Sequence, residues 1–421
     1  MKRLIAAVVA APFCVLAAQA QTSPPPADGD MLTLGEALTE AGRISPAPVA
    51  AQAGVSAAEA ARAVAGLRPN PSISIETENL LGTGPYRGFD ESDTTVAFAL
   101  PVELGGKRSA RVAVADAGIR QAEVDLAITR ADLRLDVTQA YIGAIAADRR
   151  AAIAEAQLAV TTENLRIARD RVMVGANSPI DEQRALLEAV RSRAEAGSAR
   201  RAAMAARSLL RPYVGDRALG ALDVGWFDRP VLASYGPDMP GRAEDMLALA
   251  AAAVDTEAAE AGVRLARSQR APDVSLMAGT RWLAGSNDQA MVFGVTIPLP
   301  VLNGGKAAVT QAARERDRAQ ARQRVALFEA EQAIAAAMAD RDRAATAVEA
   351  SGPALVASGE AARIARIGYA EGKFDQMVLL DAERTLFDTQ RAAIDARAAY
   401  HNAVARLERL TTRFRGAGEI E

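Results

Sequence analysis

Cysteine is nearly absent from this sequence. The single cysteine among 421 residues is Cys14, which lies in a segment expected to be cleaved from the mature chain. The mature chain would then have no thiol, which excludes disulfide bonds, thiol nucleophiles and thiolate metal sites. The chain has one histidine, His401, so the other possible metal ligands are carboxylates, which suit transition metals poorly. His401 is therefore expected at the surface or between helices and not as a metal ligand. We therefore expect no cofactor and no resident metal site.

Aromatic residues and net charge are scarce as well. Phe, Trp and Tyr make up 4% of the residues, and the formal net charge is −3. This near-neutral balance leaves no electrostatic footprint for nucleic acid, so no nucleic-acid partner is expected. Half of the sequence is apolar, and much of that half is alanine. Alanine combined with Arg, Glu, Gln and Leu favours long, closely packed helices over large aromatic cores.

Catalytic motifs are missing too. The sequence has no P-loop, dinucleotide fingerprint, zinc-protease motif or nucleophile elbow, and "LGGK" at 104–107 lacks the spacing of a phosphate loop. A Ser/His/Asp triad that used His401 would need a scaffold that long helical hairpins do not provide. We expect that the protein is not an enzyme.

Long hydrophobic runs are confined to the N-terminus. Residues 1–20 match a signal peptide, with Lys2 and Arg3, an apolar stretch at 4–18 and "AQA" before the expected cleavage site. A retained membrane helix is the alternative, but the apolar stretch is short for a span of about 20 residues. Phe13 before Cys14 is a poor context for lipidation, and a proline-rich leader follows at 21–30. No later run could form a helical span, so any membrane insertion would use β-strands.

Two units with the same plan follow each other along the chain. The first, 31–220, is expected to contain strands at about 71–81 and 93–101 and a helical hairpin at about 103–211. The second, 221–413, is expected to contain strands at about 273–283 and 289–299 and a hairpin at about 304–413, before a tail at 414–421. "GGK" recurs at 105–107 and 304–306, and "RIAR" at 166–169 and 363–366. These similar offsets indicate a duplication.

The helical hairpins are unusually long. No proline interrupts residues 103–172, and about 70 helical residues would extend roughly 105 Å. Such a length implies a coiled coil or a helical barrel. The four strands cannot close a barrel alone, whereas three copies would supply twelve strands and twelve long helices. The alternative is a soluble periplasmic coiled-coil protein whose four strands form a small β-sandwich, because the period-two alternation of the strands fits that structure as well.

Several segments resemble one known family. They are "LTLGEAL", "LRPNPSISIE", "PVELGGKR", "SQRAPDVSLMAGTRW" and "VTIPLPVLNGGKAAVTQA". They resemble the outer-membrane factor (TolC-like) family over about 32–412, and "PVELGGKR" resembles its CzcC-like heavy-metal efflux branch. The resemblance implies a mainly α protein with a membrane β-barrel: a homotrimer with a twelve-stranded barrel and a periplasmic α-helical tunnel. It implies the outer membrane of a Gram-negative bacterium, a periplasmic adaptor and an inner-membrane pump of the resistance-nodulation-division type.

The resemblance also assigns roles to the hairpin turns. Adaptor contacts are expected at the two tips, at Val174, Gly175, Ala176, Gly372 and Lys373. Closure of the pore is expected at Asp381, Asp181 and Tyr369. Two positions depart from the family pattern, because Val378 replaces a second pore aspartate and Phe374 replaces the arginine that joins the latch in some relatives. The alternative interpretation of a charged residue beside a helix turn is that it is simply exposed to solvent and has no role in the pore.

The junctions between strand and helix form a third candidate site. The two joints contain Pro101, Gly105, Gly106, Pro300, Gly304 and Gly305. The prolines are expected to end strand pairing, and the glycines to permit a sharp change of chain direction. Glu103 can favour the start of the first long helix, whereas the second copy has Leu302 there.

The leading hypothesis is an outer-membrane export duct of a tripartite efflux system for divalent heavy-metal cations. A duct for multidrug efflux or type I protein secretion is the first alternative. A periplasmic coiled-coil adaptor or structural protein is the second.

Overall fold

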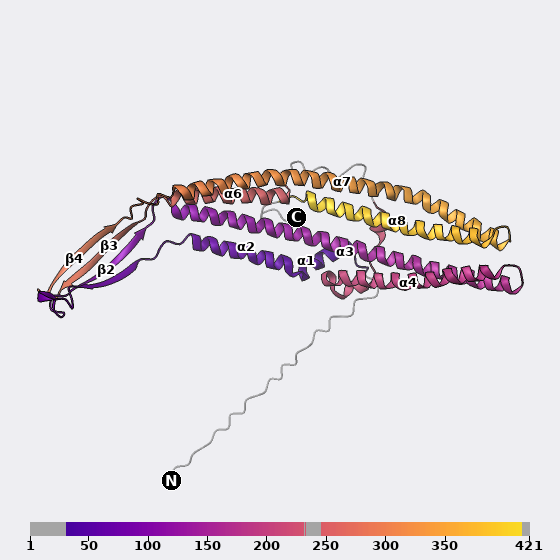
Figure 1. The fold of residues 1–421 in the computed structure, drawn as a ribbon, viewed down its shortest axis with the longest axis horizontal. Helices are drawn as coiled ribbons and strands as arrows, with labels where there is room; N and C mark the ends of the chain where they lie inside the picture. Colours follow the sequence, from indigo (N-terminus) through magenta and orange to yellow (C-terminus); the bar gives the residue numbers. More distant parts are fainter. Residues whose placement is uncertain (1–30, 231, 233–245, 415–421) are drawn as a thin grey trace, which may run out of the picture.

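The computed structural model describes residues 31–230, 232 and 246–414. The predicted signal peptide, the leader and the tail after residue 414 lie outside these residues. The protein is elongated, with a β-sheet at one end and long helices forming the rest (Figure 1). None of the helices in the described ranges is both long enough and apolar enough to cross a membrane.

The first repeat places two helices before a strand pair and a helical hairpin after it. Its helices and strands are α1 (Leu34–Ile44), α2 (Pro46–Ala65), β1 (Ser72–Glu78), η1 (Gly84–Tyr86), β2 (Asp93–Val102), α3 (Lys107–Met173) and α4 (Pro179–Val214). Thr33 closes a capping box with Glu36 at the start of α1, which satisfies two backbone donors that the helix leaves free. At 67 residues α3 extends about 100 Å.

The second repeat has the same order of elements. It comprises α6 (Leu247–Ser268), β3 (Val274–Leu283), β4 (Asp288–Thr296), α7 (Lys306–Ala370) and α8 (Gln376–Thr411). The duplicated unit expected from the sequence is therefore confirmed. The first hairpin was expected to end at about residue 211, but α4 continues through Pro212 to Val214. Two short helices follow there, η2 (Gly215–Leu219) and α5 (Gly225–Asp228).

The four strands form one antiparallel sheet in the order β1-β2-β3-β4. The repeats therefore join through β2 and β3, where Phe98 pairs with Ala278. On the outer sides, Phe98 pairs with Ile73 of β1 and Ala278 pairs with Phe293 of β4. Among the described residues, β1 and β4 each have one edge without a partner strand.

One face of this sheet is apolar and exposed. The pairing register aligns large side chains on it, and the exposed fractions are 72% for Ile73, 47% for Phe98 and 75% for Phe293. The opposite face carries small and charged residues, among them Ala97 and Gly279, where a Cβ on Gly279 would lie 2.4 Å from a backbone oxygen. Successive strand residues point to opposite faces, so the period-two pattern separates the two chemistries.

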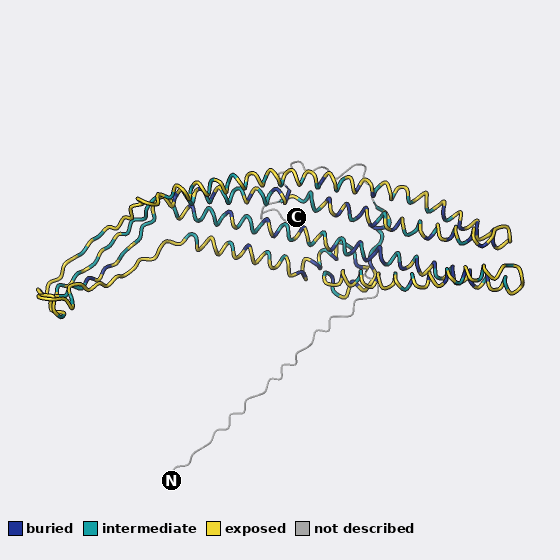
Figure 2. Tube along the Cα trace, viewed as in Figure 1, coloured by how far each residue is buried: buried dark blue, intermediate teal, exposed yellow. Residues whose placement is uncertain are grey.

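The long helices are each covered by two shorter partners. α2 and α4 lie along successive parts of α3, and α6 and α8 lie along successive parts of α7 (Figure 1). Alanine fills the contacts inside the first hairpin, at Ala147, Ala151 and Ala203. Figure 2 shows buried segments along α3, α4 and α8, whereas α7 is mostly exposed.

The largest core lies in the middle of the helical part, where the chain enters and crosses between repeats. Tyr141 is fully buried there, and its hydroxyl lies 2.5 Å from the Leu32 carbonyl oxygen. Burial raises the pKa of Tyr141 to about 12. Leu32 also pairs with Leu222 in a parallel bridge, so one tyrosine ties the start of the first repeat to the crossover segment.

His401 belongs to the same core. Its ring lies 4.3 Å from Trp226 and 5.4 Å from Phe227 between ring centres, and Nε2 lies 3.2 Å from the Phe227 carbonyl oxygen. The expectation of a position between helices agrees with this contact between α8 and α5. Burial lowers the pKa of His401 from its ordinary value, because desolvation disfavours the charged imidazolium.

We predict that His401 makes stability depend on pH between about 5 and 7. Its folded pKa is below the unfolded value of about 6.5, so the folded state binds fewer protons and stability falls as pH drops below that value. His401 is the only histidine in the chain, and the variant His401→Gln should lose this slope. Denaturant unfolding at pH 5, 6 and 7 measures it, and equal slopes for both proteins would contradict the prediction.

Candidate functional site

The first hairpin reverses at Gly175. This residue has φ +74°, a left-handed conformation that favours glycine. The next two backbone N–H groups, of Ala176 and Asn177, donate to the Arg171 carbonyl oxygen at 2.8 and 3.3 Å. Ser178 then caps α4 by accepting from the backbone of Ile180.

The second hairpin reverses in the same way at Gly372. Its φ is +72°, and Lys373 and Phe374 donate to the Gly368 carbonyl oxygen at 2.8 and 3.2 Å. Asp375 caps α8 through a 3.0 Å bond from Val378. Nothing lies within 4 Å of a Cβ added at Gly175 or Gly372. Glycine is therefore favoured at both tips by backbone conformation alone.

Direct bonds join the two tips within one protomer. Arg171, near the end of α3, donates to the Tyr369 carbonyl oxygen at 2.8 Å and lies over the Tyr369 ring, 4.2 Å from its centre. A cation at this position also suits the negative end of α7. Gln376 donates to the Asp181 carbonyl oxygen at 3.1 Å. Each hairpin thus holds the end of the other.

A buried polar cluster lies next to the tips, between α3, α7 and α8. Glu383 is 4% exposed and accepts hydrogen bonds from Asn164 at 2.6 Å and Arg366 at 2.9 Å. A cavity of about 640 Å³ adjoins the cluster and is also lined by Tyr369 and Leu379. The carboxylate is acceptable in this position because both partners donate to it.

The cluster is one step of a polar seam along α3. Arg150, Gln157, Asn164 and Arg171 follow one another at intervals of seven residues. Their partners in the second repeat are Asp395, Arg391, Glu383 and the Tyr369 backbone. This seam is not among the features predicted from the sequence, although the seven-residue spacing of polar residues on an alanine-rich helix is a signal for it.

The three residues expected at the pore closure have different surroundings. Asp381 is exposed and has no hydrogen bond or ion pair with any described residue. Asp181 is half-buried, accepts from Asn177 at 3.2 Å and lies 3.9 Å from Arg184. Tyr369 is 4% exposed, and its hydroxyl has no partner in the described part of the chain. Asp181 and Tyr369 are not bonded to each other.

Phe374 has a packing role in this structure. A Cβ on Gly368 would lie 2.2 Å from the Phe374 ring. The missing side chain of Gly368 therefore leaves the space that Phe374 occupies, one turn before the tip glycine.

The first strand–helix joint turns through two glycines and is held by ion pairs. Gly105 and Gly106 both have φ +72°, and Gly106 precedes the first turn of α3. Lys107 donates to Asp273 at 2.6 Å, and the Leu104 N–H donates to the same carboxylate at 3.2 Å. The Lys107 bond lowers the pKa of Asp273. The first joint is thereby attached to the chain just before β3.

Glu103 was expected to favour the start of α3, but it has a different role. It pairs with Arg111 through both carboxylate oxygens, one at 3.0 Å, and this bond lowers the pKa of Glu103. The same Arg111 donates to the Leu67 carbonyl oxygen at 3.0 Å. Glu103 therefore holds Arg111, and Arg111 links α3 to the end of α2.

The two prolines behave differently from expectation. Pro101 lies inside β2 and stays in register with Ser275, and pairing with β3 continues to Val102. Only the pairing with β1 stops before Pro101, at Ala99. In the second repeat β4 ends at Thr296, four residues before Pro300. The pairing of β2 with β3 is thus not ended by Pro101, since proline lacks only the N–H and keeps a usable carbonyl. The pairing of β4 has already ended before the chain reaches Pro300.

The second joint uses one left-handed glycine. Gly305 has φ +70° and precedes α7, whereas Gly304 is not in the left-handed region. Arg270, just after α6, donates to the Gly304 carbonyl oxygen at 3.2 Å. A Cβ on Gly305 would lie 2.8 Å from the Arg270 side chain, and one on Gly105 would lie 2.5 Å from Ala271. Both joints therefore pack against the end of α6.

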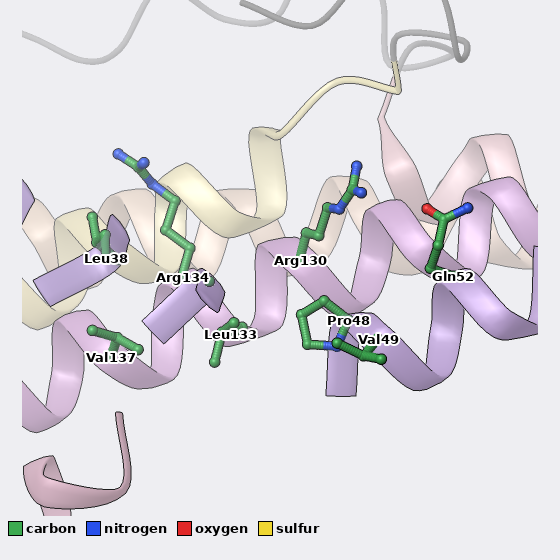
Figure 3. A pocket seen from close by; sticks show the side chains of 9 residues that line it. Leu38, Pro48, Val49, Gln52, Arg130, Leu133, Arg134 and Val137 are labelled. Atoms are coloured by element: carbon green, nitrogen blue, oxygen red, sulfur yellow. The ribbon is translucent and has the colours of Figure 1, made fainter. Parts of the chain in front are cut away.

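A further hollow of about 540 Å³ lies between α1, α2 and α3. Its walls are mainly aliphatic, and the guanidinium groups of Arg130 and Arg134 extend away from Pro48 and Val49 (Figure 3). Arg134 is engaged by Glu408 at 2.9 Å. In the described part of the chain, no group of three or more His, Asp or Glu side chains is placed to hold a metal ion.

The family model for outer membrane efflux proteins matches residues 38–216 and 243–413, which include both repeats. The chain belongs to the outer membrane efflux protein family. The resemblance stated from the motifs is confirmed, and membership places this efflux protein in the outer membrane, with its long helices in the periplasm.

Two relatives of this chain within the family are metal-resistance proteins by name. The chain is 27% identical over 354 residues to the cobalt-zinc-cadmium resistance protein CzcC of Cupriavidus metallidurans, covering 82% of this chain and 81% of CzcC. It is 29% identical over 278 residues to the nickel-cobalt-cadmium resistance protein NccC of Alcaligenes xylosoxydans xylosoxydans, covering 65% of this chain and 61% of NccC.

Solved structures share the fold of this efflux protein. A membrane protein from Pseudomonas aeruginosa aligns with a TM-score of 0.76 at 23% identity, covering 90% of both chains. The outer membrane protein VceC from Vibrio cholerae aligns with a TM-score of 0.74 at 22% identity, covering 91% of this chain and 97% of VceC. Identities this low establish the fold alone.

We predict that Gly105→Ala destabilises the protein by about 2–5 kcal/mol. The left-handed φ costs roughly 1–2 kcal/mol for alanine, and the close approach to Ala271 adds overpacking of about 1–3 kcal/mol. Gly304→Ala is the matched control, because its φ is ordinary and its nearest neighbour lies 3.9 Å away. Thermal unfolding in detergent measures both, and equal midpoints would refute the role of Gly105.

We predict that Glu383→Gln lowers the unfolding free energy by about 1–3 kcal/mol, because buried hydrogen bonds to a charged group are worth that much. Glu163→Gln is the control. Glu163 lines the same cavity, but it is exposed and pairs with Arg166 on its own helix, so little change is expected. A chemical denaturation series compares the two, and a larger loss for Glu163→Gln would overturn the assignment.

Proposed function

We propose that this protein is the outer-membrane export duct of a tripartite resistance-nodulation-division efflux system that exports divalent heavy-metal cations. The observation that supports the duct most directly is the four-stranded sheet, which has an apolar exposed face and, among the described residues, two edges without a partner strand. Unpaired strand edges are untenable in lipid, so the sheet must be completed by other copies. Three copies give twelve strands, an even number within the range of known barrels.

The exposed side of α7 supports assembly of copies along the helices as well. Large apolar side chains on it are solvent-exposed in the single chain, with Val325 at 53%, Phe328 at 61% and Val356 at 75%. Exposed apolar surface of this kind is favourable to cover with a neighbouring protein. In the proposed homotrimer the helices continue the barrel as a periplasmic tunnel.

The choice of cargo rests on the relatives. CzcC and NccC are resistance proteins for cobalt, zinc, cadmium and nickel by name, and all three metals of CzcC form divalent cations. We infer that no dedicated ion site is needed in a passive duct, so selection would reside in the pump and the adaptor. We propose no catalytic activity for the protein.

The tips are the proposed docking and closure points. Val174, Gly175, Ala176, Gly372 and Lys373 lie at the ends of the hairpins farthest from the sheet (Figure 1), where a periplasmic adaptor can reach them. Asp381 lies on α8 close to its tip and has no partner among the described residues of its own protomer, so three copies would place three such carboxylates in one acidic ring. Such a ring favours cations. Val378 leaves no second ring, and Asp181 and Tyr369 would act through the inter-hairpin bonds beside them.

A deletion strain of the native host tests the function. Loss of the gene should increase sensitivity to Co²⁺, Zn²⁺ or Cd²⁺ without changing sensitivity to hydrophobic drugs, and the intact gene should restore resistance. Restoration of drug resistance alone would favour a multidrug duct, and a lost secreted protein would favour type I secretion. A monomer in the soluble periplasmic fraction would refute the duct itself.

In planar bilayers, Asp381→Asn should lower the cation preference of the channel. Asp388→Asn, one heptad further along α8 and already near Arg384 and Arg391, should leave it unchanged.

A further inference from the structure

A small cavity lies beside the first strand–helix joint. It measures about 390 Å³ and is lined by Arg68 and Arg108, by Glu103, and by the apolar residues Leu100, Pro101 and Val102. Arg68 makes no hydrogen bond or ion pair with the described residues. Arg108 uses only its Nε, which donates to the Gly66 carbonyl oxygen at 2.5 Å. The terminal nitrogens of both guanidinium groups are therefore available to an outside acceptor.

The carboxylate in this cavity does not cancel the two arginines. Glu103 is already engaged by Arg111, which donates to both of its oxygens. Arg68 and Arg108 thus remain as uncompensated positive charges, and paired guanidinium groups match the oxygens of a phosphate.

A second hollow, of about 500 Å³, lies on the sheet and shares one lining residue, Leu100, with the first. It is lined on the apolar exposed face by Phe98, Leu100, Leu276, Phe293 and Val295. Leu100 lines both hollows, so the cationic cavity and the aliphatic groove meet at one side chain. A ligand that fills both must have an anionic head and a hydrocarbon tail.

The charge at the two ends of the sheet favours an anionic head group at the helical end. At the helical end, residues 66–69, 100–111, 268–274 and 300–306 contain six cationic side chains and two carboxylates, an excess of four positive charges. At the far end, residues 78–93 and 283–288 contain five carboxylates and one arginine. Basic residues gathered next to a membrane-facing surface attract anionic lipid headgroups.

We propose that the joint binds an anionic phospholipid, with its phosphate between Arg68 and Arg108 and one acyl chain in the groove over Phe98, Leu100 and Leu276. The inference rests on the proposed function, because lipid reaches the joint only when the strands cross a membrane. The bound lipid would fix the depth of the sheet in the bilayer at the level where the chain turns into α3.

Lipid titration of the purified, delipidated protein tests the site, with native mass spectrometry as the readout. Short-chain phosphatidylglycerol should bind more tightly than phosphatidylcholine of equal chain length. The double variant Arg68→Gln/Arg108→Gln should bind phosphatidylglycerol roughly thirtyfold more weakly, from about fivefold for each cation near an anionic surface. Its affinity for phosphatidylcholine should not change.

Three controls separate charge from folding. Arg68→Gln alone, which removes no internal bond, should weaken binding about fivefold, and Arg108→Lys should keep most of the affinity. Arg193→Gln/Arg201→Gln on α4 removes two exposed charges far from the joint and should have no effect.

Three results would overturn the proposal: undiminished phosphatidylglycerol binding by the double variant, equal affinity for the two lipids, or displacement of lipid by inorganic phosphate at the same concentration. The last would indicate a site for free phosphate. Metal resistance of the wild type and its presence in the outer-membrane fraction are measured separately, so the lipid site can fail while the duct stands.

Discussion

The turn from strand into long helix is the constraint on which the rest of the structure depends. Gly105 in the first joint and Gly305 in the second adopt left-handed conformations, and both pack so closely on the end of α6 that a Cβ would collide with it. Asp273 and Arg270, which follow α6, bind the two joints directly. One helix end therefore sets the direction of both long helices relative to a single sheet, and the two repeats share one alignment.

The contacts within and between the hairpins differ in chemistry. Within the first hairpin, alanine side chains such as Ala151 and Ala203 allow α3 and α4 to approach closely. Between the hairpins, near the tips, the contact includes buried polar groups, with Glu383 held by Asn164 and Arg366. Apolar contacts tolerate small displacements, whereas a buried carboxylate is costly as soon as its donors move away. The polar seam therefore specifies one relative position of the two hairpins.

The sheet is asymmetric in two directions. Across its thickness it separates large apolar side chains from small and charged ones, and along its length it separates a basic end from an acidic end. The first asymmetry suits a surface between lipid and an aqueous interior. The second gives the proposed phospholipid site its sign, because the helical end presents the guanidinium groups of Arg68 and Arg108 beside the apolar groove.

The sequence alone determined the duplicated plan, the positions of the strands and long helices, and the glycines at the tips. These features follow from local rules: alternation for strands, absence of proline for helices, and the left-handed preference of glycine. Only the tertiary structure decided the partners of Arg171, Glu103 and Glu383, and it showed that Pro101 remains within a paired strand. The contacts of Arg171 with Tyr369 and of Asn164 with Glu383 join residues 198 and 219 positions apart in the chain. The local sequence pattern does not say which of these distant residues become partners, because the pairing is set by how α3, α7 and α8 pack against one another.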